Sequence, residues 1–387
     1  MSAETDLVFL TSRYPYPLDK GDRVRAFHQV RELGKFFRVH VICLSESLPQ
    51  PEFLRPVAEM CYSLHVFPIS RWKRRLRMVK AVFSNLPLQV AYFDDPHVRR
   101  QIQFLIKRIS PDHVHCHLVR MVPYLPTSGP WLTSIDYMDS LVLNDLAAHH
   151  LKTGLLRVLL AKERKDIKRY ETIVSDSSDH HFVISDRDRL CFEAPIRERL
   201  TLLPNGIDLD YFQFQEESEA TYDVVFCGNL GYAPNLKAAL YLRDVIAARL
   251  QDVTFLIAGA QARNSLLNHS LANVTVMGRQ EDIRHSYRSG AIFVAPLWEG
   301  SGQQNKILEA MALGIPVVTT SHVNAGIGAD PASDLLIADD TDEFIRQINQ
   351  LLSRPHQRLT IKRKARQFVE DNFNWSVNTT PLVEVIS

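Results

Sequence analysis

The chain has 387 residues, of which 45% are hydrophobic and 23% are charged, and these proportions are typical of an ordinary globular protein. One hydrophobic core seldom serves more than about 250–300 residues, so two domains are expected. With 45 basic and 44 acidic residues, the net charge of +1 gives no electrostatic reason to expect nucleic acid as the main partner.

Short apolar runs alternate with segments of helical periodicity through the first half of the chain. Residues 7–11 and 39–44 are two such runs, and the segment between them carries apolar residues at helical spacing: Val24, Phe27, Val30 and Leu33. Further runs of strand length lie at residues 63–67, 113–117, 132–135, 181–184 and 202–203. This alternation predicts a doubly wound parallel sheet that binds ligands at the carboxyl ends of its strands.

One helical segment, residues 71–83, is unusually basic. Its apolar residues form a single seam, and Arg and Lys occupy much of the remaining surface; the seam consists of Trp72, Leu76, Val79 and Phe83. Such a helix either contacts an anionic membrane surface or packs through its seam as an ordinary solvated helix. The local density of cations in a nearly neutral chain favours the membrane.

Three histidines alternate on the run 113–117, so they point to one face of the predicted strand: His113, His115 and His117. Zinc ligation is one interpretation, but no carboxylate or thiol on the same face completes a site. A buried strand that ends in polar residues is the simpler interpretation. Asp136 and Asp139 follow the next run, where they either bind a ligand or serve the structure.

A second series of strands begins after a change in composition near residue 205. The turn-forming sequence Leu203–Asp208 and a polar stretch come first. Apolar runs then follow at residues 223–228, 254–259, 274–278, 292–297 and 317–320. Residue 205 is therefore the predicted start of a second α/β domain.

The segment 295–318 is the most informative part of the chain. A polar loop containing Gly300 and Gly302 follows a strand, a helix begins near Asn305, and Gly314 ends it before the next strand. Glycines allow a ligand close to the backbone, and the free N–H groups of a helix start favour an anion such as phosphate. Lys306 adds a positive charge, and Glu309, one turn beyond Asn305, is placed to accept a bond from a sugar hydroxyl.

This loop, with Leu-Glu-Ala-Met-Ala-x-Gly-x-Pro-Val-Val around Glu309, resembles the donor-binding signature of the family-four retaining glycosyltransferases. The resemblance extends over nearly the whole chain. It is similar in particular to a subgroup of sugar transferases associated with bacterial exopolysaccharide and exosortase systems. The fold implied is α/β of the GT-B class, with two facing Rossmann-like domains and a cleft between them.

The resemblance implies an acceptor-side domain over residues 1–204, completed by a C-terminal helix over 366–387, and a nucleotide-sugar domain over 205–365. It places Glu309 on the nucleotide ribose. The family's first glutamate is displaced, because seven-residue spacing falls on Ser301 and the nearest acid is Glu299. An Arg and a Lys that grip the diphosphate in many members, just past Gly228, are also missing.

Further site residues follow from the resemblance. The proposed catalytic residues are His117, which matches a histidine that reaches the transferred sugar, Lys306 and Glu299. The expected donor-binding residues are Gly21, Gly228, Asn229, Gly259, Arg279, Gly302, Gln303, Gln304, Asn305 and Glu309. Asn235 is either a helix N-cap or a ligand-facing amide, and Arg279 either frames the base or is a solvated charge. Asp22 is either a helix cap or part of the site.

The implied activity is metal-independent, retaining transfer of a sugar from a nucleotide-diphosphate sugar to a saccharide or polyprenyl-linked acceptor in exopolysaccharide biosynthesis. No cofactor is expected besides the donor substrate, and no Asp-x-Asp pair is suitably placed for Mg²⁺. Leaving-group charge is then stabilised by Lys306, the helix start and Arg13 or Arg23. Two alternatives are a nucleotide-sugar 2-epimerase and a non-catalytic nucleotide-sugar-binding scaffold.

Five cysteines without paired spacing favour reduced thiols and a cytoplasmic location: Cys43, Cys61, Cys116, Cys191 and Cys227. The sequence contains neither a signal-peptide pattern at its start nor an apolar stretch long enough to span a membrane. Any membrane attachment is therefore expected to be peripheral, on the inner face of the cytoplasmic membrane.

Overall fold

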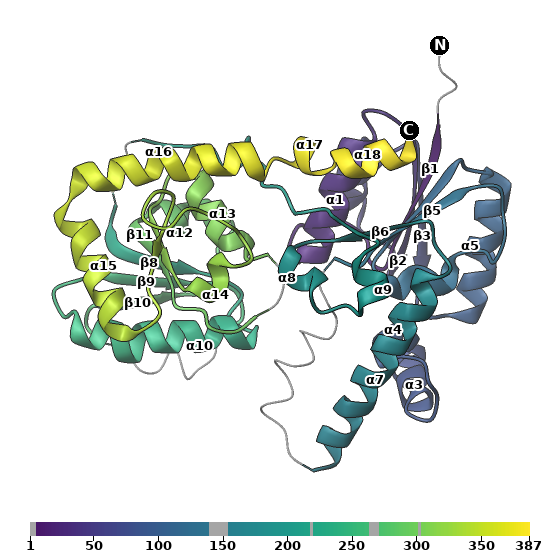
Figure 1. Cartoon of the computed structure of the whole chain (residues 1–387), viewed down its shortest axis with the longest axis horizontal. Coiled ribbons are helices and arrows are strands. Elements are labelled where there is room, and N and C mark those ends of the chain that lie inside the picture. The colour runs from purple at the N-terminus through teal and green to yellow at the C-terminus, as the bar shows by residue number, and fades with distance from the viewer. Residues whose placement is uncertain (1–4, 139–153, 217–219, 263–270, 301–302) are drawn as a thin grey trace. The chain divides into compact units, whose positions relative to one another are not determined.

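The computed structural model describes residues 5–138, 154–216, 220–262, 271–300 and 303–387 (Figure 1). These residues form two compact units. The first contains residues 1–204 and 378–387, and the second contains residues 205–377.

The first unit is built on a parallel sheet with strand order β3-β2-β1-β4-β5-β6-β7. Its strands are β1 (Asp6–Thr11), β2 (Arg38–Ser45), β3 (Ser63–Pro68), β4 (His113–His117), β5 (Leu132–Asp136), β6 (His180–Val183) and β7 (Leu200–Leu202). The register pairs Thr11 with both Cys43 and His117. The carboxyl ends of β1, β2 and β4 therefore lie at the same edge, where a doubly wound sheet binds ligands.

Helices cover both faces of this sheet. They are α1 (Gly21–Leu33), α2 (Pro51–Ala58), α3 (Arg71–Ala81), α4 (Leu88–Phe93), α5 (Pro96–Ile109), η1 (Val119–Tyr124), α7 (Leu155–Ser175), α8 (Asp186–Arg189), α9 (Ala194–Arg197) and α18 (Thr380–Ile386). Successive residues of a strand point to opposite faces, so β1 serves two cores. Leu7 and Phe9 pack with α1 and α18, whereas Val8 and Leu10 belong to the core that contains residues of α5 and α7.

The second unit has a smaller parallel sheet of order β10-β9-β8-β11-β12-β13. Its strands are β8 (Tyr222–Cys227), β9 (Phe255–Ala258), β10 (Val274–Met277), β11 (Gly290–Ala295), β12 (Val317–Thr319) and β13 (Leu336–Ile337). Its helices are α10 (Ala233–Tyr241), η2 (Leu242–Ala247), α12 (Ile283–Arg288), α13 (Asn305–Ala312), α14 (Ser321–Asn324), α15 (Thr341–Ser353) and α16 (Pro355–Asn372). The short helix α17 (Trp375–Asn378) lies where the chain passes from this unit to the first.

The C-terminal segment differs from the sequence-based expectation. Residues 366–372, which the resemblance assigns to the first domain, instead continue α16 in the second unit. The reason is packing, because Ile361, Ala365 and Val369 of this helix are buried in the core of the second unit. Of the C-terminal segment 366–387, only residues 378–387 lie in the first unit.

The basic segment forms α3, but its apolar seam does not pack against the protein. Trp72, Leu76, Val79 and Phe83 are 69%, 47%, 62% and 88% exposed. The interpretation of α3 as a helix packed through this seam is therefore wrong. No described helix is long and apolar enough to cross a membrane.

Two cations of α3 belong to the protein interior instead. Arg74 is 3% exposed, and its guanidinium lies 5.2 Å from the ring centre of Tyr92 and 5.4 Å from that of Phe93. Arg77 forms an ion pair with Asp95. Sequence periodicity places both residues among the free cations of the helix. The structure corrects this, because the aromatic rings of α4 lie beside Arg74 and the carboxylate of Asp95 pairs with Arg77.

Candidate functional site

The carboxyl edge of the second unit's sheet brings two loops together. β8 and β11 are neighbouring parallel strands, so the loop after each lies at this edge. The loop after β11 leads to α13, whose N-cap residue Gln304 makes no side-chain cap bond. Gly300 has φ of +126°, a conformation that L side chains rarely adopt. Gly302 and Ser301 lie outside the described residues.

Lys306 links the two loops. Its Nζ donates to Oε1 of Gln304 at 2.6 Å, and a Cβ placed on Gly228 at the end of β8 would lie 3.6 Å from its Cε. A positive charge carried by α13 therefore lies beside Gly228 in this chain. Burial lowers the pKa of Lys306 to about 8, although the nearby carboxylate of Glu309 opposes the shift.

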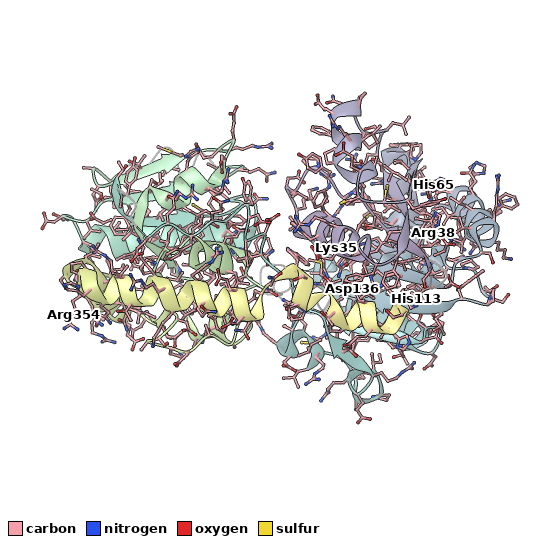
Figure 2. All side chains as sticks on the ribbon, turned by 90° about the horizontal axis from the view of Figure 1, so that it is seen from above. Lys35, Arg38, His65, His113, Asp136 and Arg354 are labelled. Carbon is pink, nitrogen blue, oxygen red and sulfur yellow. The ribbon has the colours of Figure 1, made fainter. Side chains whose placement is uncertain are left out.

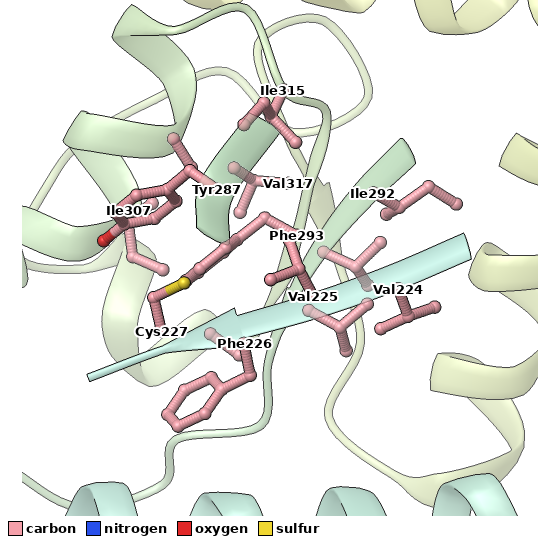
Figure 3. Close-up of a cluster of buried hydrophobic side chains, with 14 of the residues drawn as sticks. Val224, Val225, Phe226, Cys227, Tyr287, Ile292, Phe293, Ile307, Ile315 and Val317 are labelled. Atoms are coloured by element: carbon pink, nitrogen blue, oxygen red, sulfur yellow. The ribbon is translucent and has the colours of Figure 1, made fainter. Parts of the chain in front are cut away.

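Glu309 is held by a residue that sequence reasoning missed. The hydroxyl of Tyr287 in α12 donates to its Oε2 at 2.8 Å. The Tyr287 ring packs beside Phe293 at 5.3 Å between ring centres and beside Ile307 (Figure 3). Burial raises the pKa of Glu309, and the bond from Tyr287 and the charge of Lys306 partly offset this. Among the described residues, this bond to Oε2 is the side-chain hydrogen bond that orients the Glu309 carboxylate, and it leaves Oε1 available.

The glycine at the end of β9 is required by the close approach of the loop after β8. A Cβ on Gly259 would lie 1.7 Å from the carbonyl oxygen of Gly228, which leaves no room for any other residue. The Asn229 carbonyl accepts from Nδ2 of Asn235 at 3.0 Å, and its Oδ1 accepts from the N–H of Gly231 at 2.9 Å. The N-cap interpretation of Asn235 is wrong, because Tyr232 is the N-cap and Asn235 lies inside α10.

Gln303 and Asn305 contact the start of the second unit. The Gln303 side chain accepts from the N–H of Asn205 at 3.0 Å and donates to its carbonyl oxygen at 3.1 Å. Oδ1 of Asn305 accepts from Nδ2 of Asn205 at 3.4 Å. These two amides therefore fix the position of the loop, a task that the sequence pattern does not indicate.

Glu299 and Arg279 lie on the solvent side of the same edge. Glu299 pairs with Lys237 of α10 at 2.7 Å, and both side chains are 48% exposed. Arg279 is exposed in the segment after β10. The ion pair holds Glu299 toward α10 in this structure, and Lys237 is a second residue that sequence reasoning missed.

In the first unit, His117 lies at the end of β4 and is fully buried. Its Nδ1 is 3.5 Å from Oγ1 of Thr11, and among the described residues its Nε2 has no hydrogen-bond partner. Burial lowers the pKa of His117 to about 4, so the ring is neutral at pH 7. His113 and His115 share the Ser134 hydroxyl at 2.7 and 2.8 Å. Within the described part of the chain, no group of three or more His, Cys, Asp or Glu side chains is placed to hold a metal ion.

Gly21 and Asp22 begin α1 at the same edge as His117. Asp22 forms an ion pair with Arg13 and lies 3.8 Å from Arg120. Burial alone would raise the pKa of Asp22, but these two guanidinium groups lower it overall. The N-cap of α1 is Lys20, so the interpretation of Asp22 as the cap is wrong.

Asp136 has a structural role. It is fully buried, accepts from Nε of Arg25 at 2.6 Å and from Nε2 of Gln29 at 3.0 Å, and lies inside the first unit with His113 (Figure 2). Both of these side-chain donors come from α1, so the carboxylate ties this helix to β5. Asp139, the other carboxylate predicted here, lies outside the described residues.

Comparison with known proteins agrees with this geometry. Residues 221–354 match the family model described as "Glycosyl transferases group 1". A Klebsiella pneumoniae protein named "Uncharacterized 44.6 kDa protein in cps region" is 22% identical, with 95% of this chain and 96% of the relative aligned. Two solved structures are similar over almost the whole chain. Anabaena HepE in complex with UDP and glucose has a TM-score of 0.70 at 12% identity, covering 99% of each chain. Sucrose-phosphate synthase from Thermosynechococcus elongatus has a TM-score of 0.72 at 15% identity, covering 98% of each chain.

The expected fold class is confirmed: the chain is α/β, with two Rossmann-like domains that match glycosyltransferases of the GT-B class. Residues 221–354, the part of the chain that matches the group 1 glycosyl transferase model, contain both Lys306 and Glu309.

Proposed function

We propose that the chain is a retaining, metal-independent glycosyltransferase that moves a sugar from a nucleotide-diphosphate sugar to a saccharide or lipid-linked acceptor in exopolysaccharide biosynthesis. The observation that carries this proposal is the meeting of Lys306, Glu309 and Gly228 at one edge of the second unit. HepE, a structural neighbour, was solved with UDP and glucose, which supports a donor of this class. The cps region in the name of the Klebsiella relative is consistent with a role in polysaccharide synthesis.

Each group at this edge has a task in donor binding. Backbone N–H groups at the start of α13 and around Gly228 bind the diphosphate, and Gly259 lets the two strand ends come close enough to form this surface. Glu309 accepts bonds from ribose hydroxyls through the oxygen that Tyr287 leaves available. Gln304 holds the Lys306 ammonium at 2.6 Å and orients it toward the diphosphate.

Lys306 supplies the main catalytic effect. During transfer, the bond between the anomeric carbon and the diphosphate oxygen breaks with its electron pair on the diphosphate. An acceptor hydroxyl forms the new bond to the anomeric carbon and gives its proton to the departing diphosphate oxygen. Negative charge on the diphosphate grows toward the transition state, and a partly buried cation stabilises it more strongly than a solvated one. In this proposal, His117 and Glu299 contact the transferred sugar.

The test is donor consumption by wild-type protein and Lys306→Ala, measured at steady state over a range of donor concentrations and also under single-turnover conditions, after a thermal-shift screen of UDP-, GDP- and ADP-sugars identifies the donor. Lys306→Ala is expected to lower kcat more than it weakens donor binding, because only interactions stronger in the transition state raise the rate. Lys107→Ala, an exposed lysine of α5, is the matched control and should behave as wild type. A higher KM with normal kcat would mean that Lys306 only anchors the ground state.

The same experiment separates the two alternatives. An epimerase would convert the nucleotide sugar to an isomer without an acceptor, and a non-catalytic scaffold would bind the donor and leave it unchanged. Neither alternative is favoured by a particular contact in the site.

Location and partners complete the proposal. The protein acts in the cytoplasm, peripherally on the inner face of the cytoplasmic membrane, where a lipid-linked acceptor would be reached. The exposed seam of α3 supports membrane contact, because four large apolar side chains there meet water instead of protein. Arg75 and Lys80 remain exposed beside this seam, whereas Arg74 and Arg77 are engaged within the first unit.

A further inference from the structure

The long helix α7 separates its charges by sign between two faces. Arg157, Arg164, Lys165 and Arg169 are exposed. The carboxylates of the same helix point inward, because Glu163, Asp166 and Glu171 are only 6%, 5% and 4% exposed. From Arg157 to Arg169, the solvent face of α7 therefore carries cations and no carboxylate.

The inward carboxylates have structural tasks. Glu163 accepts from the N–H of Leu88 at 2.7 Å, and Asp166 forms an ion pair with Lys162. Among the described residues, none of the four exposed cations is in an ion pair, so their charge is available to a partner.

α7 is attached to the end of α3. Nζ of Lys162 donates to the carbonyl oxygen of Ser84, just past α3, at 2.5 Å, and Leu88, which Glu163 binds, begins α4. Figure 1 shows α3, α4 and α7 next to one another in the first unit. The basic face of α7 and the exposed apolar seam of α3 thus belong to one region of this unit.

We propose that α3 and α7 together form a single docking surface for a bilayer rich in anionic phospholipid. The inference rests on the membrane contact proposed for α3 and assigns the two helices different tasks. The apolar seam of α3, from Trp72 to Phe83, enters the interface between headgroups and acyl chains. The cations of α7 attract the anionic headgroups without entering the bilayer.

Charge decides between a bilayer and a second copy of this chain. A two-fold interface between identical surfaces would place the cations of α7 and α3 opposite the same cations of the partner. Like charges brought together with no carboxylate between them repel, so a homodimer through this surface is disfavoured. A layer of anionic headgroups instead attracts the same cations.

The test is co-sedimentation of the full chain with vesicles of phosphatidylcholine alone or mixed with phosphatidylglycerol. The triple variant Arg164→Glu, Lys165→Glu, Arg169→Glu is compared with Arg100→Glu, Lys107→Glu, Arg108→Glu. The second set changes the net charge equally and lies on the exposed face of α5 in the same unit. One cation near an anionic surface strengthens binding about fivefold, so loss of three, with added repulsion from the new carboxylates, should weaken binding to anionic vesicles by at least about a hundredfold. The α5 control should bind like wild type.

A second pair of measurements separates the tasks of the helices. Trp72→Ser with Phe83→Ser should remove the part of binding that survives high salt, because apolar insertion is not screened. In the α7 variant, by contrast, the remaining binding to anionic vesicles should depend little on salt concentration. Equal binding by the α7 variant and wild type, or equal loss in the α5 control, would overturn the proposal. So would a dimer in sedimentation velocity that the α7 changes dissociate.

Thermal shift with UDP, GDP and ADP on the same proteins keeps this inference separate from the proposed function. If the wild-type protein binds a nucleotide but does not sediment with anionic vesicles, the docking surface is refuted and the proposed function is not. Vesicle binding by a protein that binds no nucleotide refutes the donor site and leaves the docking surface standing.

Discussion

The lowered pKa of Lys306 predicts a specific pH dependence of catalysis. Burial lowers the pKa of this ammonium to about 8 in the free protein, so the charge is present below pH 8 and lost above it. If the cation is needed to stabilise the leaving diphosphate, kcat/KM should fall about tenfold, or about 1.4 kcal/mol, for each pH unit above 8. The kcat profile should break at higher pH, because a bound diphosphate favours the charged form of Lys306.

Two neighbouring groups stay protonated in this window. Burial raises the pKa values of Tyr287 and Cys227 well above their usual values. The assay is the initial rate of nucleotide release from about pH 6.5 to about pH 10. Lys306→Arg keeps its charge throughout and should show no break near pH 8. A wild-type profile that stays flat to pH 10, or the same break in Lys306→Arg, would refute this assignment.

Three further predictions concern binding, stability and metal. Glu309→Gln should weaken binding of the donor by about 1.5–3 kcal/mol in calorimetry, because a charged acceptor is replaced by a neutral one; unchanged affinity would exclude Glu309 from the ribose site. Asp136→Asn should lower the free energy of unfolding by about 3–5 kcal/mol in urea titrations, because it leaves Arg25 buried without its charged partner; a loss below about 1 kcal/mol would contradict the structural role of Asp136. Turnover should survive excess EDTA, and strict dependence on added Mg²⁺ or Mn²⁺ would show that the proposed metal independence is wrong.

Local periodicity was enough to predict most of the two sheets. The strands differ from the expected runs by a few residues, since buried parallel strands appear in sequence as short apolar runs between helical segments. β13 has only Leu336 and Ile337, too few residues for a run to stand out. In α1, the expected apolar face includes Val24 and Phe27, yet both are only partly buried, whereas Arg25 and Gln29 are fully enclosed. Their burial depends on Asp136, more than a hundred residues away in the chain, which no local pattern reveals.

The candidate site likewise combines features that local sequence predicts with contacts between distant residues that it does not. One turn of helix separates Lys306 from Glu309, so their shared position follows from local spacing. The partners Tyr287, Lys237 and Asn205 come from other elements, and their contacts exist only once the sheet has assembled. Likewise, the apolar seam of α3 indicates a helix with one apolar face, but the sequence does not show whether that face packs against protein or contacts a membrane.

The place of α18 in the first unit has a consequence for the order of events during synthesis. Leu382 and Ile386 pack in the same core as Leu7 and Phe9, although the whole second unit lies between them in the chain. While a ribosome is still translating residues 205–377, that core lacks one of its covering helices. The second unit contains its own core and can fold as soon as it emerges. We therefore expect the first unit, although most of it is synthesised first, to complete its folding after the second unit. Nascent chains that stall before residue 380 should present an uncovered apolar face of the first unit to chaperones.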